Sequence, residues 1–402
     1  MQKGISVPES LEGLLVRRAL GDKAAEKAAG GRLSKKELAE ITAAMLELSD
    51  RFNGIDATPL GEYMASRWHR AAYFLYFLPA NFAKAQAVLW ELAPTLSGKT
   101  TLSVLDAGSG PGSLSLGLLD FVARQTDIRE LKILALDSSR EALEDWRFLV
   151  RGYAGVLAEE GKALKASYVT RTVDLAAAEA AEGEYDVVLF GDSLNELFAG
   201  SDEGVKERAA LLADYAGRLT SGGSIVVIEP ALKELSRQVQ AIRDLLVRDY
   251  GMSIYAPCLR QGPCPMLAAG RERDWCHTAV LWMRPRIVRQ IDEIAKRNKH
   301  VVKFSYLVAR RTNGCPVEIP EGAQTLRVVG DRMAEKGKFH ALLCGEGGCE
   351  KYTLLRRDEV PAREDFTRMH RGDIVSVLKG GERGDGIRLD GESTISLLKK
   401  FS

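Results

Sequence analysis

The cysteines are the residues whose chemistry stands out first. Cys258, Cys264 and Cys276 lie close together in one stretch rich in proline and glycine. Cysteine thiolates bind zinc and hold iron–sulfur clusters. The spacing matches neither a C-x2-C zinc ribbon nor a ferredoxin run, so regular metal spacing is absent. Three thiols within one proline-rich loop nevertheless predict a thiolate-bound metal, which the spacing does not identify. A fourth ligand would come from Cys315, Cys344, Cys349 or His277. Buried, unligated thiols are the alternative, because free cysteine is a common core residue.

A glycine-rich turn, "VLDAGSGPGSLSLGLL", is the most specific motif. A predicted strand ends at Asp106, and Gly108, Ser109, Gly110 and Gly112 follow before a predicted helix. Glycine lets a ligand approach the backbone, and a helix N-terminus offers free N–H groups. Dinucleotide sites also use such a turn, but an acidic residue directly before the glycines suits an ammonium better than a pyrophosphate. The motif resembles motif I of class I S-adenosylmethionine-dependent methyltransferases; a simple tight turn is the alternative.

Acidic residues also end the next three predicted strands. Asp137 follows "KILAL", Asp174 follows "YVTRTV" and Asp192 follows "DVVLFG". Ligands of open α/β sheets bind beyond the carboxyl ends of the strands. We expect Asp137 to accept the ribose hydroxyls, Asp174 to lie near the adenine, and Asp192 with Asn195 to lie beside the methyl donor. Helix capping or a surface role is the alternative for each, and no general base can be assigned.

These motifs require an α/β scaffold. From residue 101, short apolar strands alternate with helical patterns, which predicts a parallel sheet covered by helices. We expect a class I methyltransferase Rossmann-like domain over residues 96–312, with a cysteine-rich insert at 251–277. A helical N-terminal region over 1–95 precedes it. Strand-rich, glycine-punctuated sequence over 313–402 predicts a small C-terminal β-barrel-like domain.

Helix boundaries can be read at three places. Ser34 with Glu37, and Ser138 with Glu141, form predicted capping boxes, in which a serine and a glutamate satisfy free N–H groups at a helix start. The stretch 66–92 reads as a helix pair broken near Pro79, because proline interrupts helical hydrogen bonding.

Composition limits the class of protein. Of 402 residues, 46% are hydrophobic and 28% charged, with a formal net charge of +1, which is typical of a globular protein. No apolar run approaches the roughly 18 residues of a membrane-spanning helix. The start lacks a signal-peptide core, and no transit peptide is evident. We therefore expect a cytoplasmic, monomeric protein without membrane association, whose thiols are reduced or metal-bound.

One stretch is strongly basic although the whole chain is nearly neutral. Only Asp292 and Glu293 oppose its positive charge, so it predicts a surface for a polyanion such as RNA, with a solvated helix as the alternative. Its basic residues are Arg284, Arg286, Arg289, Lys296, Arg297, Lys299, Lys303, Arg310 and Arg311.

The order of several motifs resembles one family. These motifs are "LDAGSGPG", "EYDVVLFGDSLNELF", "VVIEPA", the cysteine run ending in "WCH", and "KFSYLVARR". Together they are similar to the methyltransferase-like family of mitochondrial small-ribosomal-subunit assembly proteins and their bacterial relatives. The resemblance implies S-adenosylmethionine as a cofactor and small-subunit ribosomal RNA as a partner. It also implies the mitochondrial matrix if the source is eukaryotic.

The resemblance further implies a [4Fe–4S] cluster, with zinc as the alternative metal. The family pattern assigns the ligands to Cys258, Cys264, Cys276 and, after a "KG-x-H" turn, Cys344. Cys349 is the rival for the fourth position. Where the family carries Pro-His after the first cysteine, this chain has Leu259 and Arg260. Two functions remain open: an RNA methyltransferase, or a catalytically inactive ribosome-assembly or translation factor that keeps the donor fold. A small-molecule methyltransferase is the weaker third reading.

Overall fold

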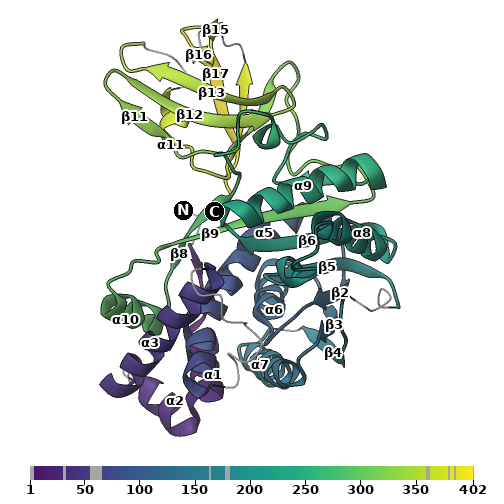
Figure 1. The fold of residues 1–402 in the computed structure, drawn as a ribbon, viewed down its shortest axis with the longest axis vertical. Coiled ribbons are helices and arrows are strands. Elements are labelled where there is room, and N and C mark those ends of the chain that lie inside the picture. The colour runs from purple at the N-terminus through teal and green to yellow at the C-terminus, as the bar shows by residue number, and fades with distance from the viewer. Residues whose placement is uncertain are drawn as a thin grey trace. The chain divides into compact units, whose positions relative to one another are not determined.

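The computed structural model has a mixed α/β fold with a second, mainly antiparallel sheet (Figure 1). The chain divides into two compact units, which are described separately. The first unit comprises Met1–Leu89, Leu96–Ala177 and Leu281–Val302, and the second comprises Trp90–Thr95, Ala178–Val280 and Lys303–Ser402. The structure describes residues 4–29, 33–54, 66–162, 164–176, 182–358, 363–378, 381–383 and 386–401.

Helices dominate the N-terminal part of the first unit. Ser34 and Glu37 form the predicted capping box at the start of α3. The helical elements here are α1 (Glu9–Leu20), α2 (Asp22–Ala29), α3 (Lys35–Phe52), α4 (Arg67–Ala72), a π-helical turn (Tyr73–Phe77) and α5 (Leu78–Leu96). The predicted break near Pro79 is wrong: the helical path continues through the π turn, and Pro79 lies in the first turn of α5. Proline is tolerated there, and a wider turn absorbs the interrupted hydrogen-bond ladder.

A parallel three-stranded segment forms the sheet of the first unit. Strands β2 (Thr101–Ala107), β3 (Glu130–Asp137) and β4 (Lys165–Thr172) pair in that order. Helices α6 (Ser113–Gln125) and α7 (Arg140–Glu159) follow β2 and β3. The short strand β1 (Ile5–Ser6) pairs with the end of β8 (Thr278–Met283), and α10 (Arg286–Ala295) follows. The predicted strand–helix alternation is confirmed here.

The second unit holds the remaining strands of the α/β part. Strands β5 (Tyr185–Gly191) and β6 (Leu219–Pro230) are parallel, and β9 (Val301–Arg310) runs antiparallel to β6. Helices α8 (Gly204–Ala216) and α9 (Lys233–Tyr250) flank β6 in the sequence. The cysteine-rich insert expected at 251–277 contains a short strand, β7 (Ser253–Ala256), paired with β9, and a 3-10 turn (Pro265–Leu267).

The C-terminal sheet is mainly antiparallel, and β13 pairs with β16 in parallel. Its apolar core includes Leu326, Leu343, Leu354 and Phe366. Its strands are β10 (Gln324–Val328), β11 (Met333–Glu335), β12 (Lys338–Gly345), β13 (Gly348–Leu355), β14 (Ile374–Leu378), β15 (Gly381–Arg383), β16 (Gly386–Leu389) and β17 (Thr394–Lys399), with the short helix α11 (Arg363–Arg368). The expected strand-rich C-terminal part thus forms a second sheet, in the order β15-β16-β13-β12-β10-β14-β17.

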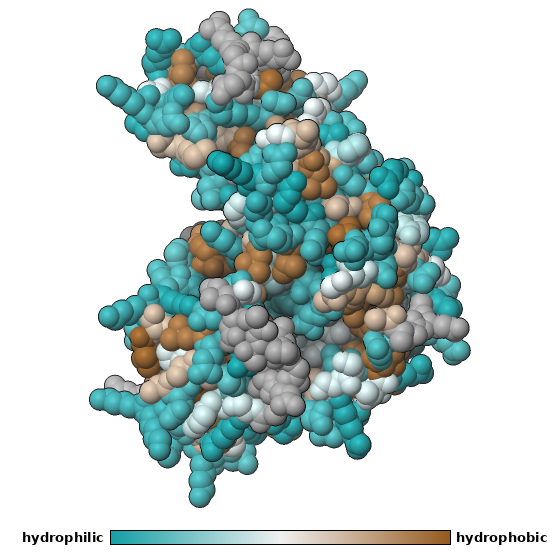
Figure 2. All heavy atoms as spheres, viewed as in Figure 1, coloured by the Kyte–Doolittle hydropathy of each residue, from teal (hydrophilic) through white to brown (hydrophobic). Residues whose placement is uncertain are grey.

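One face of the molecule is mainly polar. Figure 2 shows hydrophilic residues covering most of one face, with hydrophobic residues in small groups among them. No helix of the described residues is both long enough and apolar enough to cross a membrane.

Candidate cofactor sites

The glycine-rich turn of the first unit connects β2 to α6. Gly108, Gly110 and Gly112 all have positive φ, at 69°, 50° and 96°. A side chain at Gly112 would approach the Trp146 ring to 2.8 Å, so this position needs glycine, whereas the space beside Gly110 is open. The turn is anchored because the N–H groups of Gly108 and Ser109 both donate to the carbonyl of Leu136, at 2.9 Å each. It is therefore a fixed loop with room for a ligand beside Gly110.

Asp106 lies beneath this turn rather than at its open side. Its residue is only 1% exposed, and the Ser115 hydroxyl donates to its carboxylate. The indole N–H of Trp146 donates in turn to Ser115 at 3.0 Å. Burial, with a smaller contribution from the nearby Asp137, raises the pKa of Asp106 to about 7. The carboxylate thus ties the end of β2 to α6, and its expected contact with an ammonium stays a prediction.

Asp137 connects the turn to the end of β3. One carboxylate oxygen accepts the N–H of Gly110 at 2.7 Å, and the other accepts the N–H of Ser139 at 2.8 Å. The helix-start prediction there was one residue off, because Ser139, not Ser138, caps α7 by accepting the N–H of Ala142. A carboxylate oxygen has more than one lone pair, so Asp137 can still accept ligand hydroxyls.

Two buried hydroxyls in the turn lack a hydrogen-bond partner. Ser109 is 7% exposed and Ser113 is 5% exposed, and neither Oγ has a partner within the described structure. Buried polar groups are almost always satisfied, so such a pair indicates a missing polar partner. The turn therefore fits a ligand with its own donors and acceptors, such as S-adenosylmethionine. Ser113 was not singled out from the sequence, where its only signal is its place at the helix start.

The other two predicted acidic residues occupy different settings. Asp174, in the first unit, is exposed and accepts the N–H of Ala176 at 3.0 Å. Asp192, in the second unit, has a left-handed φ of 52°, which is strained for a residue other than glycine. Its N–H donates to the carbonyl of Ile228 at 2.8 Å. Nearby, both the backbone N–H and the side-chain amide of Asn195 donate to the buried Glu229.

Four cysteines line one cavity of the second unit. The cavity has a volume of about 60 Å³, and its wall includes Cys258, Cys264, Cys276 and Cys344. Cys349 is not part of this wall; it is buried in an apolar cluster against which Cys344 packs. These four thiols are the ones that the family pattern named. Within the described residues, however, no three His, Cys, Asp or Glu side chains converge closely enough to hold a metal ion.

Whether the cavity fits a cluster depends on its charges and donor set. Arg243, Arg260 and Arg327 contribute to the wall, and no carboxylate does. Burial raises the pKa of Cys264 to about 12 and also raises that of Cys276. Thiols in this setting keep their protons until a cation replaces them. A cluster carries its thiolates on separate iron atoms, so the ligands need not converge on one point. The four thiols are therefore donors of the kind that a thiolate-bound metal or cluster uses.

An arginine frame holds the cysteine-bearing loop in place; the frame consists of Arg237, Arg243 and Arg327. Arg237, on α9, donates to the carbonyls of Met266, Arg271 and Asp274, at 3.0, 3.1 and 2.7 Å. It thereby fixes the part of the loop that follows Cys264.

Arg243 fixes the first part of the same loop. Its side chain donates to the carbonyls of Arg260 and Gly262 and pairs with Asp244 at 2.6 Å. Asp244 also accepts the N–H of Cys264 at 3.0 Å. The sequence carried a weak signal, because Arg243 lies on the buried side of α9. Sequence reasoning nevertheless missed this residue and the rest of the frame.

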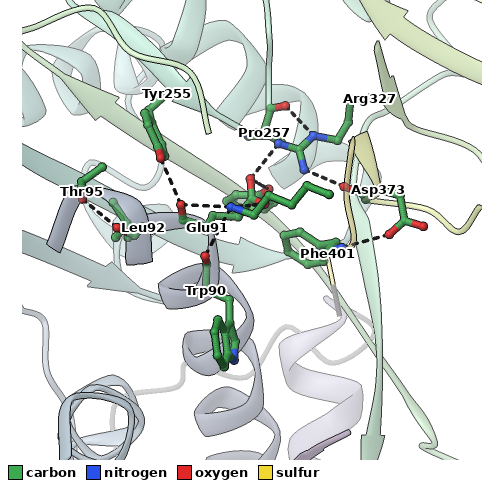
Figure 3. A network of polar contacts seen from close by, with 12 residues as sticks. Trp90, Glu91, Leu92, Thr95, Tyr255, Pro257, Arg327, Asp373 and Phe401 are labelled. Atoms are coloured by element: carbon green, nitrogen blue, oxygen red, sulfur yellow. Dashed lines mark hydrogen bonds and ion pairs between the residues drawn. The ribbon is translucent and has the colours of Figure 1, made fainter. Parts of the chain in front are cut away.

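Arg327, on β10, completes the frame through a buried polar network (Figure 3). It donates to the carbonyl of Pro257, directly before Cys258, at 2.9 Å, and to that of Gly372 at 2.6 Å. It also pairs with Glu91 at 2.7 Å. The Tyr255 hydroxyl donates to the Glu91 carbonyl at 3.3 Å. The network thus connects the entrance of the cysteine loop to the C-terminal sheet.

Several residues of the basic stretch make contacts within their own unit. In the first unit, Arg284 pairs with Asp292 at 2.6 Å, Arg286 donates to the carbonyl of Ala28, and Arg297 donates to Ser49 at 2.9 Å. The ammonium of Lys299 lies over the ring of Tyr76. Arg289 and Lys296 are exposed. The stretch therefore anchors helices as well as presenting charge.

Comparison with known proteins identifies the family of this chain. The family described as "Mitochondrial small ribosomal subunit Rsm22" matches residues 67–385. The chain belongs to the Rsm22 family. This match confirms the resemblance read from the motifs and gives the chain a family tie to the small ribosomal subunit. A search of the curated proteins found no match.

Several solved structures align with the chain, and they are methyltransferases. An O-methyltransferase family protein from Burkholderia thailandensis has a TM-score of 0.36 and 14% identity, covering 69% of this chain and 73% of its own. Magnesium protoporphyrin IX methyltransferase from Synechocystis, with bound SAM, has a TM-score of 0.32 and 16% identity, covering 59% and 84%. TrmN from Thermus thermophilus has a TM-score of 0.31 and 14% identity, covering 60% and 53%. TM-scores this low support no statement about what the chain binds or does.

Proposed function

We propose that this chain is an S-adenosylmethionine-binding, iron–sulfur protein that assists assembly of the small ribosomal subunit by binding its RNA. The observation that carries the proposal is the Rsm22 family match over residues 67–385, whose description names the mitochondrial small ribosomal subunit. The working compartment would be the mitochondrial matrix in a eukaryote and the cytoplasm in a bacterium. In either case the protein works as a monomer on its RNA partner.

The glycine-rich turn is the proposed donor site. S-adenosylmethionine supplies an electrophilic methyl group when bound. The chain's own contribution is to orient the ligand: Asp137 accepts ribose hydroxyls, and Gly108, Ser109, Gly110 and Gly112 offer backbone and hydroxyl groups beside it. Asp106 supports the turn from below, and Asp174 and Asp192 are the proposed contacts to the adenine and the methyl end. The two unpartnered hydroxyls of Ser109 and Ser113 support a polar occupant.

Calorimetric titration with S-adenosylmethionine tests this site. Asp137→Ala should weaken binding by several-fold or more, because each lost hydrogen bond contributes about 0.5–1.5 kcal/mol. Asp127→Ala, at an exposed position outside the turn, is the matched control and should bind like wild type. Equal affinity in both variants would remove the assignment.

The cavity is the proposed cluster site, with Cys258, Cys264, Cys276 and Cys344 as ligands. A [4Fe–4S] cluster supplies four metal–thiolate bonds, which would join the insert to β12 as a structural clasp. The shared cavity wall and its three arginines support this ligand set. Metal-binding free energy is also folding free energy, so loss of one ligand should lower thermal stability as well as iron content.

Iron and sulfide measured in anaerobically purified protein test the cluster. Each Cys→Ser change at the four proposed ligands should lose most of the iron. Cys315→Ser is the control, because Cys315 is outside the cavity wall. Retention of iron in Cys344→Ser with loss in Cys349→Ser would reassign the fourth ligand. Zinc in place of iron in every preparation would show that the site holds zinc.

Methyl transfer to RNA is the second candidate function. The residues at the carboxyl end of β5 favour the non-catalytic alternative, because their polar groups bond to one another. Asn195 donates to Glu229, and Arg208 donates to the carbonyls of Leu197 and Asn195 at 2.8 and 3.0 Å. Transfer of tritium from labelled S-adenosylmethionine to unmodified small-subunit RNA would establish catalysis. Binding of both ligands without transfer would establish an assembly role.

A further inference from the structure

The proposed function leaves one buried thiol of the site region without a role. Cys349 is 8% exposed and does not line the cavity, yet it belongs to the apolar cluster that contains Cys264 and packs against Cys276 and Cys344. The sequence "CGEGGC" places it five residues after Cys344. The proposed iron–sulfur ligand set includes Cys344 and not Cys349.

Strand register brings the two thiols together. Cys344, on β12, and Cys349, on β13, are directly opposite one another, and Gly345 and Gly348 form the next pair toward the turn. Directly opposite residues of antiparallel strands have Cα atoms about 4.5–5.5 Å apart, within the range of about 4.4–6.8 Å found for disulfides. Side chains of such a pair point to the same face of the sheet.

The cavity gives the two thiols different roles. Cys344 is partly exposed and reaches the cavity wall, whereas Cys349 is buried behind it. Cys344 is the more exposed of the two thiols, so an oxidant meets Cys344 first. When the Cys344 sulfur is bound to iron, it cannot form a disulfide. Disulfide formation and iron–sulfur binding therefore exclude each other at this residue.

We propose that Cys349 is a resolving thiol that captures Cys344 in a cross-strand disulfide when the cluster is absent. The oxidant is a small disulfide such as oxidised glutathione. The Cys344 sulfur attacks one sulfur of the oxidant, and one glutathione leaves as a thiol that takes up the Cys344 proton. The Cys349 sulfur then attacks Cys344 in the mixed disulfide, and the second glutathione leaves with the Cys349 proton. Two electrons pass from the protein thiols to the oxidant.

The result is a reversible switch at the ligand set. The disulfide would block reloading of iron until a reductant restores both thiols, and it would protect Cys344 from irreversible oxidation. This consequence rests on the proposed cluster, in that Cys344 must be one of its ligands. The disulfide itself rests only on the register of β12 and β13.

Mass spectrometry of the full-length, metal-free, reduced protein treated with oxidised glutathione tests the proposal. Trypsin releases Phe339–Lys351, which contains both cysteines, and cleavage after Glu346 separates them. We expect this peptide to lose two hydrogen atoms, carry no glutathione, and stay joined after cleavage at Glu346. In Cys349→Ser, glutathione should persist on Cys344. Cys315→Ser should behave like wild type.

Three results would overturn the inference: stable glutathione on Cys344 of the wild type, a bridge from Cys344 to Cys258 or Cys276, or no reaction at Cys344. Iron content is scored separately. Disulfide formation in a protein that never loads iron would overturn the cluster and leave the thiol pair standing. Iron loading equal in oxidised and reduced protein would overturn the mutual exclusion.

Discussion

The guanidinium of Arg327 lies 2.7 Å from the carboxylate of Glu91, and both side chains are almost completely buried, at 4% and 1% exposure. Lys399 approaches the same carboxylate at 3.7 Å. Figure 3 shows how this pair stands at the centre of a network that also holds the backbone of Pro257. Two buried charges are costly to desolvate, so each depends on the other.

Arg327→Met should therefore destabilise the protein strongly. Removing one partner of a buried ion pair leaves an uncompensated charge and typically costs about 3–5 kcal/mol. Denaturant unfolding of the metal-free protein measures the change. Arg357→Met is the control, since Arg357 is exposed and its loss should change the free energy of unfolding by no more than about 0.5 kcal/mol. Equal effects of the two substitutions would contradict the central role of the pair.

Asp106 should make stability depend on pH. Burial raises its pKa from 3.8 to about 7, so between these pH values the folded protein holds a proton that the unfolded chain has lost. Stability therefore falls as pH rises from about 4 to about 7, by on the order of 4 kcal/mol at 1.36 kcal/mol per unit. Asp106→Asn should remove this part of the slope.

Unfolding curves of ligand-free wild type and Asp106→Asn over this pH range check the sign. Asp174→Asn is the control because Asp174 is exposed. A stability of the wild type that rises toward neutral pH relative to Asp106→Asn would mean that the carboxylate is stabilised in its charged form, contrary to this account.

The elements that the sequence predicted correctly are those that a local residue pattern determines. The two strands that carry Asp106 and Asp137 at their carboxyl ends could be predicted, because each is an apolar run followed by a glycine turn or a helix cap. The small C-terminal sheet was readable from its alternating, glycine-punctuated strands. Family pattern, rather than spacing, identified Cys344 among the possible fourth ligands, and the structure puts it on the same cavity wall as the other three.

Hydrogen bonds and ion pairs between residues far apart in the chain could not be predicted from the sequence. Arg327 and Glu91 are 236 residues apart, and nothing near either residue indicates the other. Arg237 and Arg243 resemble ordinary helix-surface arginines until the loop beyond α9 folds back and presents its carbonyls. Capping was readable only to within one residue, because Ser138 and Ser139 are adjacent and the backbone decides which one caps α7.

Arg243→Lys should loosen the cysteine loop in the metal-free protein. A single ammonium cannot serve two carbonyls and Asp244 together, and unsatisfied buried groups cost about 1–3 kcal/mol. Since 1.4 kcal/mol is a factor of ten, exchange of the Cys264 amide should rise about tenfold or more. Arg248→Lys, on the same helix, is the control, because Arg248 is exposed and pairs with its neighbour Asp249. Similar protection in both variants would mean that the loop is held by other contacts.

RNA binding should depend on the exposed part of the basic stretch. Arg289 and Lys296 are exposed, whereas Arg286 and Arg297 are engaged with the backbone of Ala28 and with Ser49. Charge reversal at the first pair therefore tests RNA contact without breaking helix anchors. Arg289→Glu with Lys296→Glu should weaken binding of single-stranded small-subunit RNA and reduce the slope of log affinity against log salt concentration by about 0.7 for each lost phosphate contact.

The control is Lys35→Glu with Lys36→Glu, at exposed positions of α3, which changes the net charge by the same amount. This pair should change RNA affinity through long-range attraction only and leave the salt slope near that of wild type. A slope reduced equally by both pairs would assign the effect to net charge, and an unchanged slope in the first pair would make α10 a solvated surface.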